Sequence, residues 1–264
     1  MLASMYSGIS GMKNFQQKLD VTGNNLANVN TFGFKKGRAT FKDMVSQQIQ
    51  GPTAAQDGGM GGSNPSQVGL GAQMGSIDTV QTQGSLQNTN RDLDLGISGD
   101  GFFKVGDGDE GEHYTRAGNF YLDDQGDLVN SDGYYVLDED DNSISIDEEA
   151  ESFSIGSNGD VNMTLPDGTE TAGTISLTSF SNPGGLEKNG SNLFNVSVNS
   201  GDPETGAPGE NGTGNLVAGT LEMSNVDMSE EFTEMITAQR GFQANTRGIT
   251  TADEVLQEIM NLKR

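Results

Sequence analysis

The sequence has no cysteine, one histidine and six prolines among its 264 residues. Without cysteine it cannot form disulfides or zinc-thiolate sites, and it cannot carry out thiol chemistry. The one histidine, His113, lies in a strand-like run, which argues against a Ser-His-Asp triad or a histidine-rich metal site. The sequence also lacks a phosphate-binding P-loop. We therefore expect no catalytic site, cofactor or bound metal, and we predict that the chain is not an enzyme.

Hydrophobic residues are also scarce, at 32% of the chain with 6% aromatic, so any compact core must be small. No apolar run approaches the roughly 20 residues that span a bilayer. The first residues, MLASMYSGISGMKNF, lack the basic start and apolar stretch of a cleaved signal peptide. We expect no membrane insertion and, if the protein is exported, a route without a cleaved signal.

Basic residues number 14 against 38 acidic ones, which gives a formal charge of −24. The imbalance lies in residues 51–219, which hold four basic and 28 acidic residues. Residues 1–50 hold six basic and two acidic residues, whereas residues 220–264 hold four basic and eight acidic ones. Nucleic acid binding needs a Lys/Arg surface and is disfavoured. The pattern indicates a hydrated acidic middle region and two ends of complementary charge.

Apolar side chains near the N-terminus recur with alternating spacings of three and four, which predicts one stripe of a helix. This stripe consists of Leu2, Met5, Ile9, Met12, Leu19 and Leu26. Gln16 and Gly23 interrupt it, and Gly8 and Gly11 each lower helix propensity by about 1 kcal/mol relative to alanine. Such a helix is too weak to stand alone and needs a partner.

A second helix is predicted from the N-cap candidates at 224–229 to the C-terminus, with acidic residues at its start. Its apolar stripe consists of Phe232, Met235, Phe242, Ile249 and Leu256, widened by Ile236, Val255 and Ile259. Gln239, Thr246 and Asp253 interrupt the stripe. The two imperfect helices are expected to pair in a coiled-coil-like layer, with apolar burial supplying the affinity and charge selecting the partner. The alternative is two helices packed on one globular core.

The middle of the chain is predicted to be β-rich. A short helix is possible over 41–49, and the Gly/Gln-rich residues 51–90 are expected to form an extended linker arm. From residue 91 to 220, short alternating runs such as GFFKV and SFSI are separated by Asp-Gly or Asn-Gly at 132–133, 158–159 and 167–168. The expected fold class is thus α+β: an N-terminal helix and arm over 1–50, a linker over 51–90, an all-β outer domain over 91–220 and a C-terminal helix over 221–264.

One acidic segment has the spacing of a calcium loop. Asp138, Asp140 and Asn142 alternate, and Glu149 stands at the twelfth position. However, Ser143 occupies the position that needs glycine, and the flanking sequences indicate strands where a calcium loop has helices. A structural acidic loop is the preferred interpretation.

Three segments at the two ends and two in the middle match a known family. Residues 19–35 (LDVTGNNLANVNTFGFK), 222–227 (EMSNVD) and 235–245 (MITAQRGFQAN) resemble the terminal signatures of bacterial flagellar rod and hook proteins. Residues 99–103 (GDGFF) and 114–120 (YTRAGNF) extend the resemblance into the β region. The close match covers roughly residues 1–45 and 220–264.

The resemblance implies an axial flagellar subunit that is exported through the flagellar type III apparatus and polymerises into a hollow tube. The implied partners are further copies of the chain, the neighbouring rod, hook, hook-cap and junction proteins, and the export apparatus. The implied location is the hook-basal body, outside the cytoplasm. The predicted assembly interface combines the helix stripes with signature residues, namely Leu2, Met5, Ile9, Met12, Leu19, Asn24, Asn25, Leu26, Asn28, Phe34, Val226, Phe232, Met235, Ile236, Gln239, Arg240, Phe242, Ile249, Leu256 and Ile259.

Within the family, motifs such as residues 34–44 (FKKGRATFKDM) and the ending NLKR are more typical of the hook protein. The chain length, with room for one β domain, and the arm at 51–90 are more typical of the distal rod protein. The sequence reading favours the torque-transmitting hook, with the distal rod as the alternative. A secreted, wall-active β-rich enzyme is a remote alternative that no pattern in the sequence supports.

Overall fold

A computed structural model describes residues 2–53, 61–107, 111–147, 150–166 and 168–262. The chain forms two units. Unit 1 comprises Met1–Leu26, Gly37–Asp78 and Asp227–Arg264, and unit 2 comprises Ala27–Lys36 and Thr79–Val226. Long terminal helices and a β-rich middle confirm the predicted α+β class.

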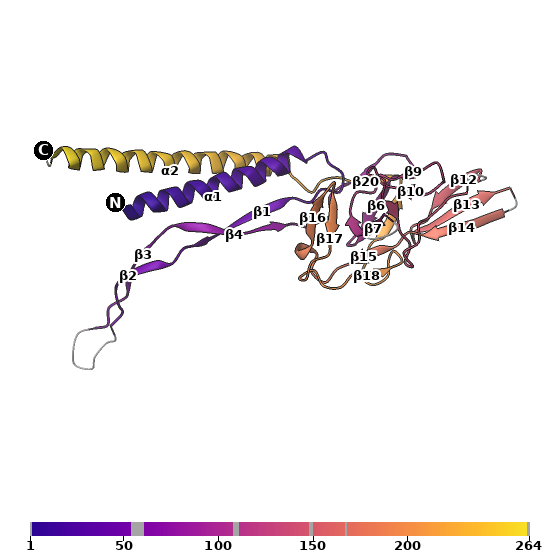
Figure 1. Ribbon diagram of the computed structural model, residues 1–264, viewed down its shortest axis with the longest axis horizontal. Coiled ribbons are helices and arrows are strands. Elements are labelled where there is room, and N and C mark those ends of the chain that lie inside the picture. The colour runs from indigo at the N-terminus through magenta and orange to yellow at the C-terminus, as the bar shows by residue number, and fades with distance from the viewer. Residues whose placement is uncertain (1, 54–60, 108–110, 148–149, 167, 263–264) are drawn as a thin grey trace. The chain divides into compact units, whose positions relative to one another are not determined.

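Unit 1 contains both helices and two strand pairs. Its elements are α1 (Leu2–Ala27), β1 (Gly37–Asp43), β2 (Ser46–Gln50), β3 (Ser66–Gly69), β4 (Ala72–Thr79, whose last residue belongs to unit 2) and α2 (Met228–Leu262). Figure 1 shows α1 and α2 side by side and antiparallel. The Asp227 carboxylate accepts hydrogen bonds from the backbone N–H groups of Ser229 and Glu230, so this predicted N-cap candidate starts α2.

Strands replace the helix considered for residues 41–49. β1 pairs with β4, and β2 pairs with β3 in an antiparallel ribbon. The spacing of Val45 and Ile49 suits a helix, but pairing with a distant segment decides the conformation, and both side chains stay exposed, at 82% and 69%. The residues 51–90 expected as a linker contain the whole of β3, β4 and β5 (Leu86–Asn88).

Unit 2 is built from short antiparallel strands. Besides β5, they are β6 (Leu95–Ser98), β7 (Phe102–Gly106), β8 (Glu112–Thr115), β9 (Tyr121–Leu122), β10 (Leu128–Val129), β11 (Tyr135–Val136), β12 (Ser152–Ile155), β13 (Asp160–Leu165), β14 (Gly168–Thr174), β15 (Leu177–Ser179), β16 (Glu187–Gly190), β17 (Leu193–Asn195), β18 (Glu204–Gly206), β19 (Asn215–Ala218) and β20 (Thr220–Glu222), with a 3-10 turn η1 at Pro183–Gly185. The largest sheet runs β16-β17-β8-β7-β11-β10-β9, with β15 joining β7 to β18. β12-β13-β14, β19-β6 and β20-β5 form smaller sheets.

The hydrophobic core of unit 2 lies around β7. Phe103, Val105 and Leu177 are fully buried there, and Phe103 packs edge-on against Phe120. A second cluster joins Phe102, Tyr114, Phe180, Leu186 and Phe194. The predicted turn glycines Gly133 and Gly159 have φ of 90° and 87°, which only glycine adopts without strain.

Tyr114 makes the stability of unit 2 sensitive to alkaline pH. Burial raises the pKa of its hydroxyl above the ordinary 10.0, helped by its hydrogen bond to Glu112. Because the unfolded chain releases this proton first, the stabilising contribution is complete below pH 10 and is lost as the pH rises towards the folded-state pKa. Urea unfolding should show that the free energy of unfolding falls as the pH rises from 8 to about 11.5. Tyr114→Phe should reduce this fall. The control Tyr6→Phe, at an exposed tyrosine, should keep the wild-type slope; an equally steep slope in Tyr114→Phe would contradict the prediction.

Candidate assembly interface

The two helices of unit 1 approach closely at glycines. A methyl group on Gly241 of α2 would lie 2.5 Å from Cζ of Phe15 on α1. A methyl group on Gly11 would lie 2.6 Å from Nδ2 of Asn245. These glycines weaken the isolated helices, but they let the two helices contact each other.

The helix pair has almost no core. Ala238 is the one fully buried apolar side chain of unit 1 among the described residues. Lys18 and Glu234 form an ion pair of 3.3 Å between the helices, in agreement with the complementary charge of the two ends. The pair is partly exposed and contributes about 0–1 kcal/mol. Most of the apolar stripe therefore remains accessible within one copy.

Asn25 ties α1 to the following strand and to α2. Its amide donates to the carbonyl of Gly37 at 2.8 Å, and its oxygen accepts from the Gly37 N–H at 2.9 Å. The same amide donates to the Glu231 carboxylate at 3.2 Å. Asn25 and Glu231 are only 2% and 4% exposed, so these bonds form away from water.

Changing Asn25 to aspartate should therefore destabilise unit 1 by about 2–3 kcal/mol, because a second carboxylate would face Glu231 and the donor to Gly37 would be lost. Thermal unfolding followed by helical circular dichroism measures the loss. Adding Glu231→Gln removes the repulsion and should recover part of the stability. No recovery in the double variant would show that the two side chains do not interact.

Three buried charged side chains meet in unit 2. The Glu222 carboxylate accepts from Lys35 Nζ at 2.6 Å and from Arg116 Nη1 at 3.1 Å. It also accepts from the backbone N–H of Gly84 at 2.8 Å. The side chains of Lys35 and Glu222 have no exposed surface. This charged cluster, Lys35, Arg116 and Glu222, connects the segment after α1 to the strand before α2.

Burial sets the electrostatics of this charged cluster. Desolvation lowers the pKa of Lys35 and of Arg116 below their ordinary values, and the Glu222 carboxylate opposes that shift in both. Asp100 adds a second favourable negative charge near both cations. Two cations and two carboxylates thus balance each other.

Asn225 also connects the segment after α1 to the segment before α2, through hydrogen bonds. Its side-chain oxygen accepts from the Lys36 N–H at 2.8 Å, and its amide donates to the Val80 carbonyl at 2.8 Å. The Lys188 ammonium donates to the Lys35 carbonyl and lies 4.9 Å from the centre of the Phe34 ring. The terminal signature residues thus hold the chain where it enters and leaves the β-rich unit.

The predicted interface residues divide by exposure. Those that are exposed are Ile9, Asn24, Phe232, Ile236, Gln239, Arg240 and Ile259. Those that are half-buried are Met5, Met12, Leu19, Leu26, Asn28, Phe34, Val226, Met235, Phe242, Ile249 and Leu256. Asn25 alone is buried, and the side chain of Leu2 lies outside the described residues. Ile249 of the α2 stripe lies beside Gly8 of α1, where an added methyl group would be 3.2 Å from its Cγ1.

Sequence reasoning left Glu222, Arg116 and Gly241 out of the site. Glu222 and Arg116 lie in the signature segments EMSNVD (222–227) and YTRAGNF (114–120), and that is the signal that could have indicated them. In the acidic segment 138–149, Asp141 forms an ion pair with the Lys104 side chain. Glu149 lies outside the described residues, and the described part of the chain has no group of three potential metal ligands.

None of the helices in the described part of the chain is long and apolar enough to cross a membrane.

Three family descriptions match successive parts of the chain. "Flagella basal body rod protein" matches residues 5–35, "Flagellar hook protein FlgE/F/G D1 domain" matches 96–163, and "Flagellar basal body rod FlgEFG protein C-terminal" matches 217–262. The flagellar basal-body rod protein FlgG of Bacillus subtilis (strain 168) is 58% identical over 266 residues, with 100% of both chains covered. The chain belongs to the flagellar hook and rod protein family. It is therefore a structural subunit of the flagellum, as the terminal signatures implied.

Other members of the hook and rod family align over the same span. FlgG of Borreliella burgdorferi is 39% identical over 269 residues, covering 100% of both chains. The flagellar hook protein FlgE of the same organism is 30% identical, but its alignment extends over 443 positions and covers 100% of both chains. The matched residues 5–35 and 217–262 include Asn25, Lys35 and Glu222.

Proposed function

We propose that the chain is a distal rod subunit, which polymerises with its own copies into the drive shaft of the flagellar basal body. The observation that carries this proposal is the match to FlgG proteins at full length on both sides, 266 residues at 58% identity. The FlgE relative instead needs 443 aligned positions against 264 residues here, so much of it has no counterpart. The comparisons favour the rod alternative over the hook interpretation that the sequence motifs suggested.

The helix pair supports assembly from many copies. The helix pair has one fully buried apolar residue among those described, and Phe232, Ile236 and Ile259 are about half exposed. Burying the apolar stripes against other copies would therefore stabilise the pair. Coiled-coil-like packing of these helices is part of the proposal, as are axial neighbours from the rod and hook and export without a cleaved signal. The acidic β-rich region would then form the outer part of the tube.

Complementation tests the assignment. The full chain should restore swimming to a B. subtilis strain that lacks its FlgG rod protein, and should not restore it to a strain that lacks its hook protein. In isolated hook-basal bodies, antibody against the chain should label the straight rod. Rescue of the hook-deficient strain alone, or label along the curved hook, would overturn the rod assignment in favour of the hook.

A further inference from the structure

The sequence contains three asparagine–glycine pairs, Asn158–Gly159, Asn189–Gly190 and Asn211–Gly212. Asparagine is a thermolabile residue, and a following glycine leaves its own backbone nitrogen unshielded. That nitrogen can attack the side-chain amide carbon of the asparagine, so that a new C–N bond closes a cyclic imide and the amide nitrogen leaves as ammonia with the backbone proton. Water then opens one of the two ring bonds. The product is aspartate or isoaspartate, and isoaspartate has one additional carbon in the main chain.

The fold holds the Asn158 pair in place. The N–H of Gly159, whose nitrogen would have to attack, donates instead to the Gly156 carbonyl at 3.0 Å. A methyl group on Gly159 would lie 2.6 Å from the Ile175 carbonyl oxygen, so the backbone here is closely packed. The attacking nitrogen is therefore both bonded and confined.

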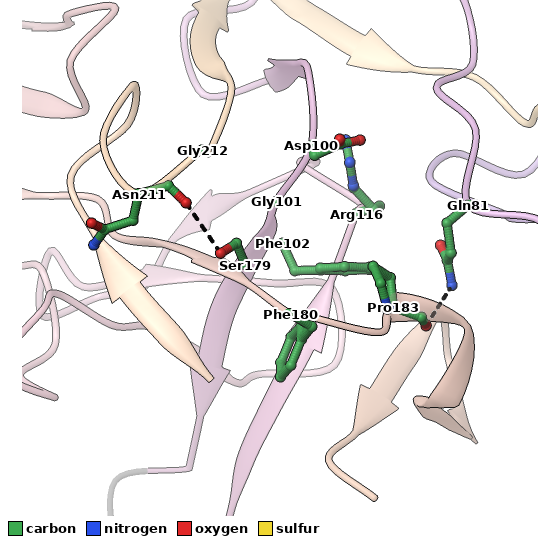
Figure 2. Close-up of a pocket in the computed structure, with 10 residues that line it drawn as sticks. All are labelled: Gln81, Asp100, Gly101, Phe102, Arg116, Ser179, Phe180, Pro183, Asn211 and Gly212. Atoms are coloured by element: carbon green, nitrogen blue, oxygen red, sulfur yellow. Dashed lines mark hydrogen bonds between the residues drawn. The ribbon is translucent and has the colours of Figure 1, made fainter. Parts of the chain in front are cut away.

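The Asn211 pair lies in a turn that is also held. The Thr213 N–H closes this turn by donating to the Glu210 carbonyl at 2.8 Å. The Asn211 carbonyl accepts from the Ser179 hydroxyl at 3.4 Å, as Figure 2 shows. A methyl group on Gly206 would lie 2.9 Å from Nδ2 of Asn211, so the Asn211 amide packs against the neighbouring strand β18. To react, this side chain would have to leave that contact.

The Asn189 pair is the least constrained of the three. It lies in β16, the terminal strand of the largest sheet, and all four residues of this strand are exposed. Lys188 pairs with Phe194 and Gly190 pairs with Leu193, so the register shifts between them and Asn189 has no partner in β17. Nothing lies within 4 Å of a methyl group on Gly190. An unpaired residue at a sheet edge moves more easily than one inside a ladder, and such movement brings the reacting atoms together.

The hairpin of β16 and β17 also anchors the segment that follows α1. The Lys188 ammonium donates to the Lys35 carbonyl at 3.0 Å, and the Asn192 amide donates to the Phe32 carbonyl at 3.1 Å. In the sequence, Asn189 lies between these two anchoring side chains. One additional main-chain carbon at this position would change the spacing of the two anchors, so both bonds could not keep their geometry.

We propose that Asn189 is a modification site, which deamidates before the other two pairs, and that its isoaspartate form releases the hairpin from residues 32–35. Water is the only reagent, so the local structure of each pair decides the order of reaction. The reaction takes place within one copy and is independent of the proposed assembly.

Peptide mass spectrometry of the full chain, incubated in mildly alkaline buffer, tests the order of reaction, because each deamidation adds about 1 Da. In the folded chain Asn189 should convert at least about tenfold faster than Asn158 and Asn211. In guanidinium, where the fold is lost and glycine still follows each asparagine, the three rates should agree within about threefold. Equal or faster conversion of another pair in the folded chain, or a tenfold lead of Asn189 that persists in guanidinium, overturns the structural selection of this site.

Hydrogen exchange tests the release of the hairpin. After conversion of Asn189, amide exchange over residues 31–36 should become at least about threefold faster, whereas exchange in β13 should stay unchanged. Asn189→Gln, incubated in the same way, should keep slow exchange over residues 31–36, which separates the effect of isoaspartate from general ageing of the sample. Unchanged exchange over these residues despite conversion, or the same rise in Asn189→Gln, overturns the release.

Discussion

Replacing Glu222 with glutamine is expected to lower the free energy of unfolding of unit 2 by about 3–5 kcal/mol. The substitution keeps the shape of the side chain but removes the charge that two buried cations share. Lys35 Nζ and Arg116 Nη1 lie 2.6 Å and 3.1 Å from its two oxygens, and the Glu222 side chain has no exposed surface. Without that charge, only the Asp100 carboxylate remains to oppose two cations whose pKa values burial already lowers.

Urea unfolding followed by tyrosine fluorescence measures this loss on the full chain. Glu187→Gln removes one acidic charge from an exposed position of β16 and should change the free energy of unfolding by less than about 0.5 kcal/mol. In a Lys35→Met background, Glu222→Gln should lower the free energy of unfolding by less, because one of the two cations that contact Glu222 is already removed. A loss below about 1 kcal/mol, or one that is the same in both backgrounds, would show that the charged cluster does not hold the junction.

The elements that sequence predicted well are those whose signals are local. Apolar spacing predicted α1, and the Asn/Gly-rich run after it agrees with a helix that ends at Ala27. Asp-Gly and Asn-Gly pairs predicted turns, and Gly133 and Gly159 have the positive φ that such turns need. The alternating run LFNVSVNS continues to residue 200, but β17 ends at Asn195. The chain turns there because the Ser197 hydroxyl donates to the Gly185 carbonyl and accepts from the Asn199 N–H.

The parts that sequence missed depend on contacts between distant residues. Lys35 and Glu222 are 187 residues apart, and no periodicity shows that they meet. Residues 46–50 and 66–69 have few apolar side chains, so alternation does not indicate the β2–β3 ribbon, which forms by pairing of two separate segments. The functional site was predicted as two apolar stripes. Within one copy, however, the buried side chains described at this site are mostly polar, namely Asn25, Glu231 and Glu222.

Gly241 and Gly248 provide the second test, because the same substitution should act with opposite sign at the two positions. Both lie in α2, one heptad apart. A methyl group at Gly241 would collide with the Phe15 ring, and overpacking of this kind costs about 1–3 kcal/mol. At Gly248 nothing lies within 4 Å of the added methyl group. Gly248→Ala should therefore stabilise the helix by about 1 kcal/mol through propensity alone.

Thermal unfolding of the helical signal should thus give a lower midpoint for Gly241→Ala than for the wild type and a higher one for Gly248→Ala. In the complementation experiment Gly241→Ala should also reduce swimming, because the proposed assembly uses the same helix pair. Shrinking the facing side chain with Phe15→Leu should make room, so that adding Gly241→Ala to Phe15→Leu costs less than it does in the wild type. If both alanine variants raise the midpoint, helix propensity alone explains them and α1 does not contact α2 at Gly241.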